Sequence, residues 1–117
     1  MNPIELKQRT KSFALRIIKL SRTIPKSDNA GQITARQIIR SGTSVVANYR
    51  ATCRARSKAE FIAKIGTVEE ESDETALWLE LLGEAGITAA RKLSALLQEA
   101  NDLTAIMAAS RKTASGA

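Results

Sequence analysis

The chain has 117 residues, a formal net charge of +6, 3% aromatic residues, six glycines, two prolines, one cysteine and no histidine. Its length suits one domain with a single core, and so few turn-forming residues favour packed helices over a β-sandwich. A lone cysteine excludes an intramolecular disulfide. Without histidine the chain lacks the commonest general base and metal ligand. We therefore expect no enzymatic activity, no metal and no cofactor, with a carboxylate-only metal site as the remaining alternative.

The basic and acidic side chains are unevenly distributed. Residues 1–56 hold 12 basic and 2 acidic side chains, whereas residues 57–86 hold 2 basic and 8 acidic ones. This asymmetry predicts two surfaces with different partners, the alternative being solubility and charge balance within the chain. No apolar run reaches the roughly 18 residues that a membrane-spanning helix needs, and the first residues do not resemble a secretory signal. We expect a cytoplasmic protein without a membrane partner.

A first helix is predicted over about residues 3–24. Asn2 can cap it, Pro3 suits its first position, and Pro25 cannot continue its hydrogen-bond ladder. Apolar residues recur at helical spacing along one side, and basic residues lie on the side facing away from them. The apolar residues are Leu6, Phe13, Ile17, Leu20 and Ile24, and the basic ones are Lys7, Lys11, Lys19 and Arg22.

A second helix is predicted over about residues 30–53, with Asn29 and Gln32 as its capping pair. At 100° per residue its apolar face comprises Ala35, Ile38, Ile39, Gly42, Val46, Tyr49 and Cys53. Cys53 is interpreted as a small buried hydrophobe, the alternative being a reactive thiol. Four arginines follow one line on the shoulder of this face, namely Arg36, Arg40, Arg50 and Arg54.

Two more helices are predicted over about residues 58–85 and 89–109. Ser57 and Glu60 form a capping box before the third, Gly86 ends it, and Thr88 can cap the fourth. Their apolar faces comprise Phe61, Ile65, Val68, Leu79 and Leu82, then Leu93, Leu96, Ala100, Leu103 and Met107. The tail after Ala109 is expected to fray. Short loops between long helices predict an all-α, up-down-up-down antiparallel four-helix bundle in a single domain.

The arginine line continues into basic residues of the following turn. These side chains suit a phosphate backbone, without reading of bases. The candidate nucleic-acid contacts are Arg36, Arg40, Arg50, Arg54, Arg56 and Lys58. The alternative is that they form salt bridges with the acidic third helix, which carries Glu69, Glu70, Glu71, Asp73 and Glu74. Because aromatic residues are so few, binding driven by shape and charge on structured RNA or a duplex is favoured over base stacking.

Further candidates concern contacts between copies. Leu77, Trp78 and Leu81 lie outside the core stripe of the third helix, which predicts an oligomer interface. The alternative is that Trp78 covers the edge of the monomer core. The acidic run of the same helix points away from the core, so a solvated or intersubunit face is favoured over a metal site. Ser41, Ser44 and Asn48 are assigned either to a polar site in the assembly or to bonds that fix helix packing.

With these helices placed, residues 40–82 resemble the bacterial four helix bundle protein family. This is the family of the 23S rRNA intervening-sequence protein, and it is related to the accessory variability protein of diversity-generating retroelements. The resemblance is carried by Ile24-Pro25, the Arg-Ser-Gly-Thr-Ser segment from Arg40 through Asn48, Arg54 to Ser57, and Glu60-Phe61. Family members often read Asn-Ile-x-Glu-Gly where residues 48–52 here lack the acid and the glycine, which makes this stretch more basic.

The resemblance implies a left-handed bundle that assembles into a homopentameric barrel with a nucleic-acid-associated, non-catalytic role. We therefore expect a homopentamer that binds RNA or DNA through the basic surface, as repeated weak contacts add up in an oligomer. The alternative is an adaptor or accessory subunit. Such a protein would dock onto a nucleic-acid enzyme such as a reverse transcriptase, or onto a ribosomal factor.

Overall fold

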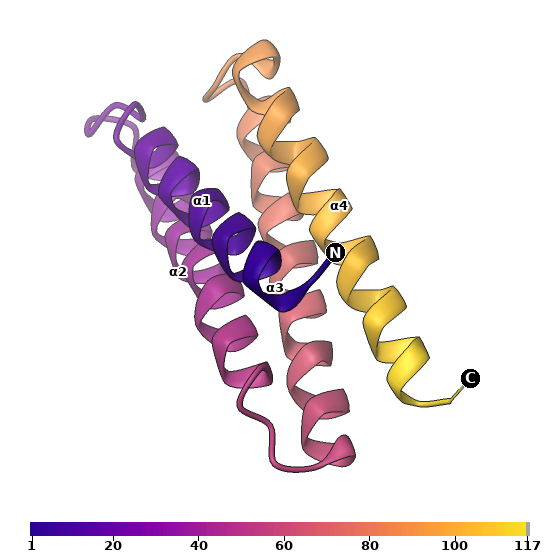
Figure 1. Cartoon of the computed structure of the whole chain (residues 1–117). Coiled ribbons are helices and arrows are strands. Elements are labelled where there is room, and N and C mark those ends of the chain that lie inside the picture. Colours follow the sequence, from indigo (N-terminus) through magenta and orange to yellow (C-terminus); the bar gives the residue numbers. More distant parts are fainter. Residues whose placement is uncertain (117) are drawn as a thin grey trace.

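Four α-helices run alternately up and down along one axis, as the sequence predicts (Figure 1). The computed structural model describes residues 1–116, in which the helices form a rod of 47 × 21 × 21 Å. The helices are α1 (Pro3–Ser21), α2 (Asn29–Thr52), α3 (Lys58–Glu84) and α4 (Ala90–Ala114). Each helix packs against its neighbours in the chain, and α1 also contacts α4. The all-α four-helix bundle is therefore confirmed.

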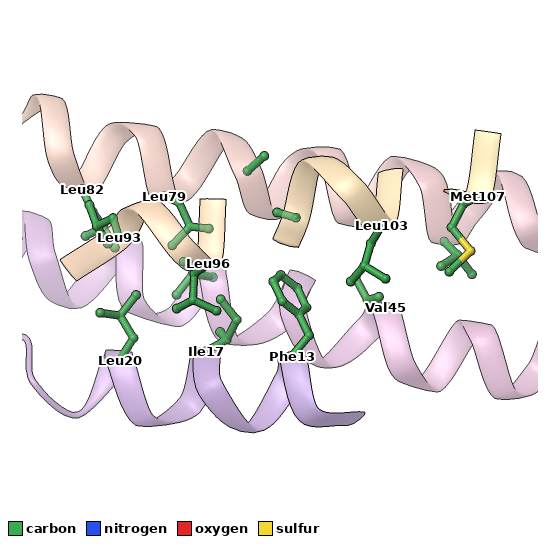
Figure 2. Close-up of a cluster of buried hydrophobic side chains, with 14 of the residues drawn as sticks. Phe13, Ile17, Leu20, Val45, Leu79, Leu82, Leu93, Leu96, Leu103 and Met107 are labelled. Carbon is green, nitrogen blue, oxygen red and sulfur yellow. The ribbon is translucent and has the colours of Figure 1, made fainter. Parts of the chain in front are cut away.

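The core runs along the whole axis and takes side chains from all four helices. Leu79, Leu96 and Ile17 point toward one another at one level of the bundle, and Leu103 and Val45 do so at another (Figure 2). Among residues 1–116, no helix has an apolar stretch of the length that a lipid bilayer requires.

The buried face of α2 differs from the predicted one at two positions. Val45 is buried where Val46 was expected, and Thr52 is buried where Cys53 was expected. The prediction that Cys53 is a buried hydrophobe is wrong, because this residue is exposed. The buried residues of α2 follow a seven-residue repeat, which keeps one seam facing neighbours that run nearly parallel to it. The repeat comprises Ala35, Gly42 and Tyr49, together with Ile38, Val45 and Thr52.

The first two helices meet at a turn that starts earlier than expected. At its start, α1 is capped by Asn2, which accepts a hydrogen bond from the Glu5 amide at 2.9 Å, as predicted. At its other end, α1 stops at Ser21, about one turn before the predicted end. The hydroxyl groups of Ser21 and Thr23 donate to carbonyls of the last turn, which closes the helix before Pro25. Asp28, rather than Asn29, caps α2, with its carboxylate 2.8 Å from the Gly31 amide.

Both ends of α3 carry the predicted signals. Ser57 Oγ accepts a hydrogen bond from the Glu60 amide, and the Glu60 carboxylate accepts one from the Arg56 amide. Gly86 adopts φ 73° just after the helix. The Ile87 amide bonds the Leu82 carbonyl at 3.0 Å, and the Gly86 amide bonds the Gly83 carbonyl at 3.1 Å. These two bonds form a Schellman motif, which requires the left-handed conformation that glycine adopts without strain.

The fourth helix is longer than predicted. The cap predicted at Thr88 is wrong, because Ala89 occupies the cap position without a side-chain bond and Thr88 is buried. The fraying predicted after Ala109 is also wrong, since α4 continues to Ala114. Arg111 Nε lies 2.7 Å from Glu69 Oε1, and this pair attaches the last turns of α4 to α3. Residue 117 lies outside the described residues.

Two adjacent small residues of α2 bring its neighbours close. A methyl group added at Gly42 would lie 3.0 Å from Cγ2 of Ile17, which is fully buried on α1. On the other side of the helix, the Thr75 hydroxyl of α3 donates to Oγ of the buried Ser41 at 2.8 Å. Because α1 and α3 both approach closely here, α2 has only one rotation that fits between them.

Replacing Gly42 by alanine should lower the free energy of unfolding. A packing conflict of about 1–3 kcal/mol outweighs a helix-propensity gain of about 0.5–1 kcal/mol. The matched control is Gly66→Ala in α3, whose added methyl would lie at an ordinary 3.7 Å from Cδ of Arg111. This control should raise the unfolding free energy by about 0.5–1 kcal/mol. Urea unfolding measures both changes, and equal stabilisation by the two variants would contradict the close approach at Gly42.

Candidate nucleic-acid interface

Five of the six basic residues predicted to contact nucleic acid lie free at the surface. Arg36 and Arg50 are on the outer side of α2, whereas Arg54, Arg56 and Lys58 belong to the turn between α2 and α3 and the first residue of α3. All five are exposed, and within residues 1–116 none of them makes a salt bridge. Their guanidinium and ammonium groups are available to an anion in solution.

Lys7 of α1 joins this group; it is one of the outward lysines of the first helix that the sequence suggested as an extension of the basic surface. Lys7, Arg50 and Arg54 line one surface depression of about 240 Å³. Antiparallel packing places the start of α1 beside the end of α2. The predicted up-down arrangement of these two helices therefore already implied that Lys7 lies near Arg50 and Arg54. Like charges held around one hollow raise the local positive potential and attract polyanions. We call Lys7, Arg36, Arg50, Arg54, Arg56 and Lys58 the basic strip.

Arg40, the sixth predicted contact, is held by α3. Its guanidinium forms salt bridges with Glu74 and, at 3.4 Å, with Glu71. The indole Nε1 of Trp78 donates to the same Glu74 carboxylate at 2.9 Å. The ion-pair alternative raised from the sequence therefore describes Arg40, whose charge is used to join α2 to α3.

The acidic residues near the basic strip do not neutralise it. Residues 1–56 contain two acids, Glu5 and Asp28, and both carboxylates accept hydrogen bonds at helix starts. The other long-range ion pairs in the described chain lie elsewhere. Arg9 pairs with Glu99 of α4 at 2.7 Å, and a hydrogen bond to that carboxylate raises the pKa of Arg9. Glu60, beside the end of the strip, accepts a hydrogen bond from the Arg56 amide and pairs with Lys64, so the six cations of the strip keep a net positive charge.

The residues predicted for the oligomer interface fall into two groups. Leu77 and Leu81 are exposed on α3, and Trp78 beside them is half-buried against the edge of the core. Ser41, in contrast, is buried between α2 and α3. The Asn48 amide donates to both Oγ and the carbonyl of Ser44, so these residues, both half-buried, bond each other along α2.

A hollow at the same end of the bundle surrounds the exposed cysteine. Tyr49, Cys53 and Lys7 line it together with Phe61 of α3 and other residues of the two chain ends. Burial raises the pKa of the Tyr49 hydroxyl well above its usual range, and a hydrogen bond with the Cys53 thiol raises it further. Across residues 1–116, no group of three or more histidine, cysteine, aspartate or glutamate side chains is arranged to hold a metal ion.

Comparison with known proteins places this geometry in a family. Residues 3–109 match the model of a family described as 23S rRNA-intervening sequence protein. The chain is also similar to a crystal structure of a protein with unknown function from the S23 ribosomal protein family of Bacteroides thetaiotaomicron. The two sequences are 28% identical over 92% of this chain and 98% of the other, with a TM-score of 0.84. No match was found among the curated proteins.

Tyr49, as the single tyrosine, allows a direct titration test. In the folded protein its phenolate absorbance should appear only well above the usual tyrosine pKa of about 10. As pH rises, the Tyr49 hydroxyl loses its proton in the unfolded chain before it does so in the folded one. The free energy of unfolding is therefore unaffected by this group below about pH 10 and falls as pH rises toward the raised pKa of the folded state. Tyr49→Phe should make this fall less steep. Titration of the native protein near the usual value would contradict the burial of the hydroxyl.

Proposed function

This chain belongs to the 23S rRNA-intervening sequence protein family, and we propose that it is a non-enzymatic, homo-oligomeric protein that binds the phosphates of RNA or DNA. The binding surface is the basic strip on α2 and the following turn, with Lys7 of α1. The family description supports a ribosomal RNA context. The observation that carries the proposal is the cluster of Lys7, Arg50 and Arg54 around one hollow with no acidic partner.

The geometry of the strip suits a phosphate backbone. Arg36 and Arg50 are separated by 14 residues of α2, which corresponds to about 21 Å along a helix at 1.5 Å per residue, and Arg54 follows in the turn after the helix. Such a row contacts several successive phosphates, each of which releases counterions on binding. Phe13 and Tyr49 of the same two helices are buried in the core, so they offer no platform for stacked bases. Affinity then comes from charge and shape, with little sequence preference.

Assembly of several copies increases this affinity. The exposed Leu77 and Leu81 favour contact with another subunit, and the family resemblance implies five copies in a ring. Each copy contributes one basic strip, so contacts that are weak alone become strong together. Arg40 takes no part in this surface, because its charge serves the contact between α2 and α3.

A second candidate function is that of an adaptor. The same exposed leucines, bordered by the acidic residues of α3, suit docking onto another protein that acts on nucleic acid. In that case the basic strip would be dispensable for the activity of the complex.

Binding of fluorescent RNA and DNA duplexes at several salt concentrations tests the proposal. The variant Arg50→Gln/Arg54→Gln should bind at least tenfold more weakly, and its salt dependence should be flatter by about one ion per arginine. The matched control is Arg91→Gln/Lys92→Gln at the start of α4, which changes the net charge equally at two exposed positions. This control should bind nearly as wild type does. Equal losses of duplex affinity in the two variants would refute the basic strip as the binding site. Wild-type affinity that does not change with salt concentration would refute it as well.

A further inference from the structure

The outward side of α1 combines exposed apolar residues with basic ones. Ile4 is 78% exposed and Leu15 is 59% exposed, which is unusual for large hydrophobic side chains that face solvent together. Lys11 and Arg22 lie on the same side of the helix as these two residues. The series Ile4, Lys11, Leu15 and Arg22 advances by seven, four and seven residues, and such steps return to nearly the same side of a helix. Within the described chain neither of these two cations makes a salt bridge. We call Ile4, Lys11, Leu15 and Arg22 the α1 outer face.

The outward side of α3 likewise combines exposed apolar residues with charged ones, but here the charged residues are acidic. Leu77 is 46% exposed and Leu81 is 42% exposed. The series Glu70, Leu77, Leu81 and Glu84 advances by seven, four and three residues, so the four side chains lie on nearly the same side of the helix. Both glutamates are exposed. Neither carboxylate has an ion-pair partner among residues 1–116. We call Glu70, Leu77, Leu81 and Glu84 the α3 outer face, and the exposed Asp73 and Glu80 border it.

The two outer faces cannot meet within one chain. In the described residues α1 packs directly against α2 and α4, whereas its backbone does not come close to that of α3, whose side chains it meets only in the core. The helices are therefore diagonal in the bundle, and their outward sides look in different directions (Figure 1). The bundle satisfies other charges internally, through the pairs of Arg9, Arg40 and Arg111 with acids of neighbouring helices. The charges of the two outer faces are among those that have no such partner in the described residues.

We propose that the α1 outer face of one copy packs against the α3 outer face of the next copy. This inference rests on the homo-oligomer of the proposed function and names the surfaces that build it. When Leu15 sits between Leu77 and Leu81, Lys11 lies about 6 Å to one side of it and Arg22 about 10 Å to the other. On α3, Glu84 and Glu70 lie about 7 and 13 Å on either side of the midpoint between the leucines. Basic groups then meet acidic groups on both sides of an apolar centre.

This contact joins two different surfaces, so it is heterologous. A heterologous contact closes into a ring if the rotation per copy completes a circle, and otherwise continues as a filament. Neither outer face includes a residue of the basic strip. The strip residues of α2 and of the turn after it therefore stay open to nucleic acid when the contact forms, whereas Lys7 borders the α1 outer face, one turn from Ile4 and Lys11.

Charge reversal tests the pairing of the two faces. The variant Lys11→Glu/Arg22→Glu makes both faces acidic, and Glu70→Lys/Glu84→Lys makes both basic. By native mass spectrometry and sedimentation at low salt, wild type should assemble, whereas each variant alone should be monomeric. An equimolar mixture of the two variants should form mixed dimers and larger even-numbered species in which the two variants alternate, because each reversed face finds its complement only on the other variant and a ring of five cannot alternate. The variant with all four reversals should also assemble.

The matched control is Arg91→Glu/Lys92→Glu, which changes the net charge as much at exposed positions of α4 and should assemble like wild type. Circular dichroism confirms that each variant keeps its helices. A monomeric wild type, unchanged assembly of both reversed variants, or failure of their mixture to assemble would each overturn the proposal. Loss of duplex binding in a variant that still assembles would instead count against the basic strip, so the two proposals fail separately.

Discussion

The rotation of α2 about its own axis determines most of what this protein presents to its surroundings. Adjacent residues fix that rotation: Gly42 admits Ile17 of α1, and Ser41 accepts the hydroxyl hydrogen of Thr75 on α3. A larger residue at position 42 would push α1 away, and a different rotation would leave the buried Ser41 hydroxyl without its partner. One close approach and one buried hydrogen bond thus hold the central helix in register with both neighbours.

That rotation separates four arginines that look alike in the sequence. Arg40 turns toward α3 and meets Glu71 and Glu74, whereas Arg36, Arg50 and Arg54 turn toward solvent. The ion pairs of Arg9 and Arg111 similarly attach α4 to α1 and α3. The bundle therefore uses some of its charges between helices and leaves others, segregated by sign, on its outer sides. The proposed activities both use the charges that remain.

The two proposed surfaces are compatible because they share no residue. Nucleic acid would contact mainly α2 and the turn after it, while neighbouring copies would join through the outer faces of α1 and α3. Assembly would then bring several basic strips together, and avidity would compensate for the small number of phosphates that one strip reaches. The half-buried Trp78 belongs to neither surface and supports the contact between α2 and α3, since its indole donates to the Glu74 carboxylate that also binds Arg40.

The bounds and order of the four helices follow largely from local features of the amino-acid sequence. Local signals were sufficient for this: Asn2 and Ser57 as caps, Gly86 as a left-handed stop, and apolar residues at helical spacing. These depend on a few neighbouring residues, so no tertiary information is needed to read them. Local signals also showed that basic side chains gather in the first half of the chain.

Which residue faces which neighbouring helix depends instead on how the helices pack. A spacing of 100° per residue placed Cys53 on the apolar face, but packing along a seven-residue repeat buries Thr52 and exposes Cys53. The last turns of α4 persist where the sequence alone suggested fraying, with Arg111 tied to Glu69 on another helix. Likewise Lys7 joins Arg50 and Arg54 only because α1 and α2 lie antiparallel. Long-range contacts of this kind depend on how the helices pack together, and no local window of sequence contains that information.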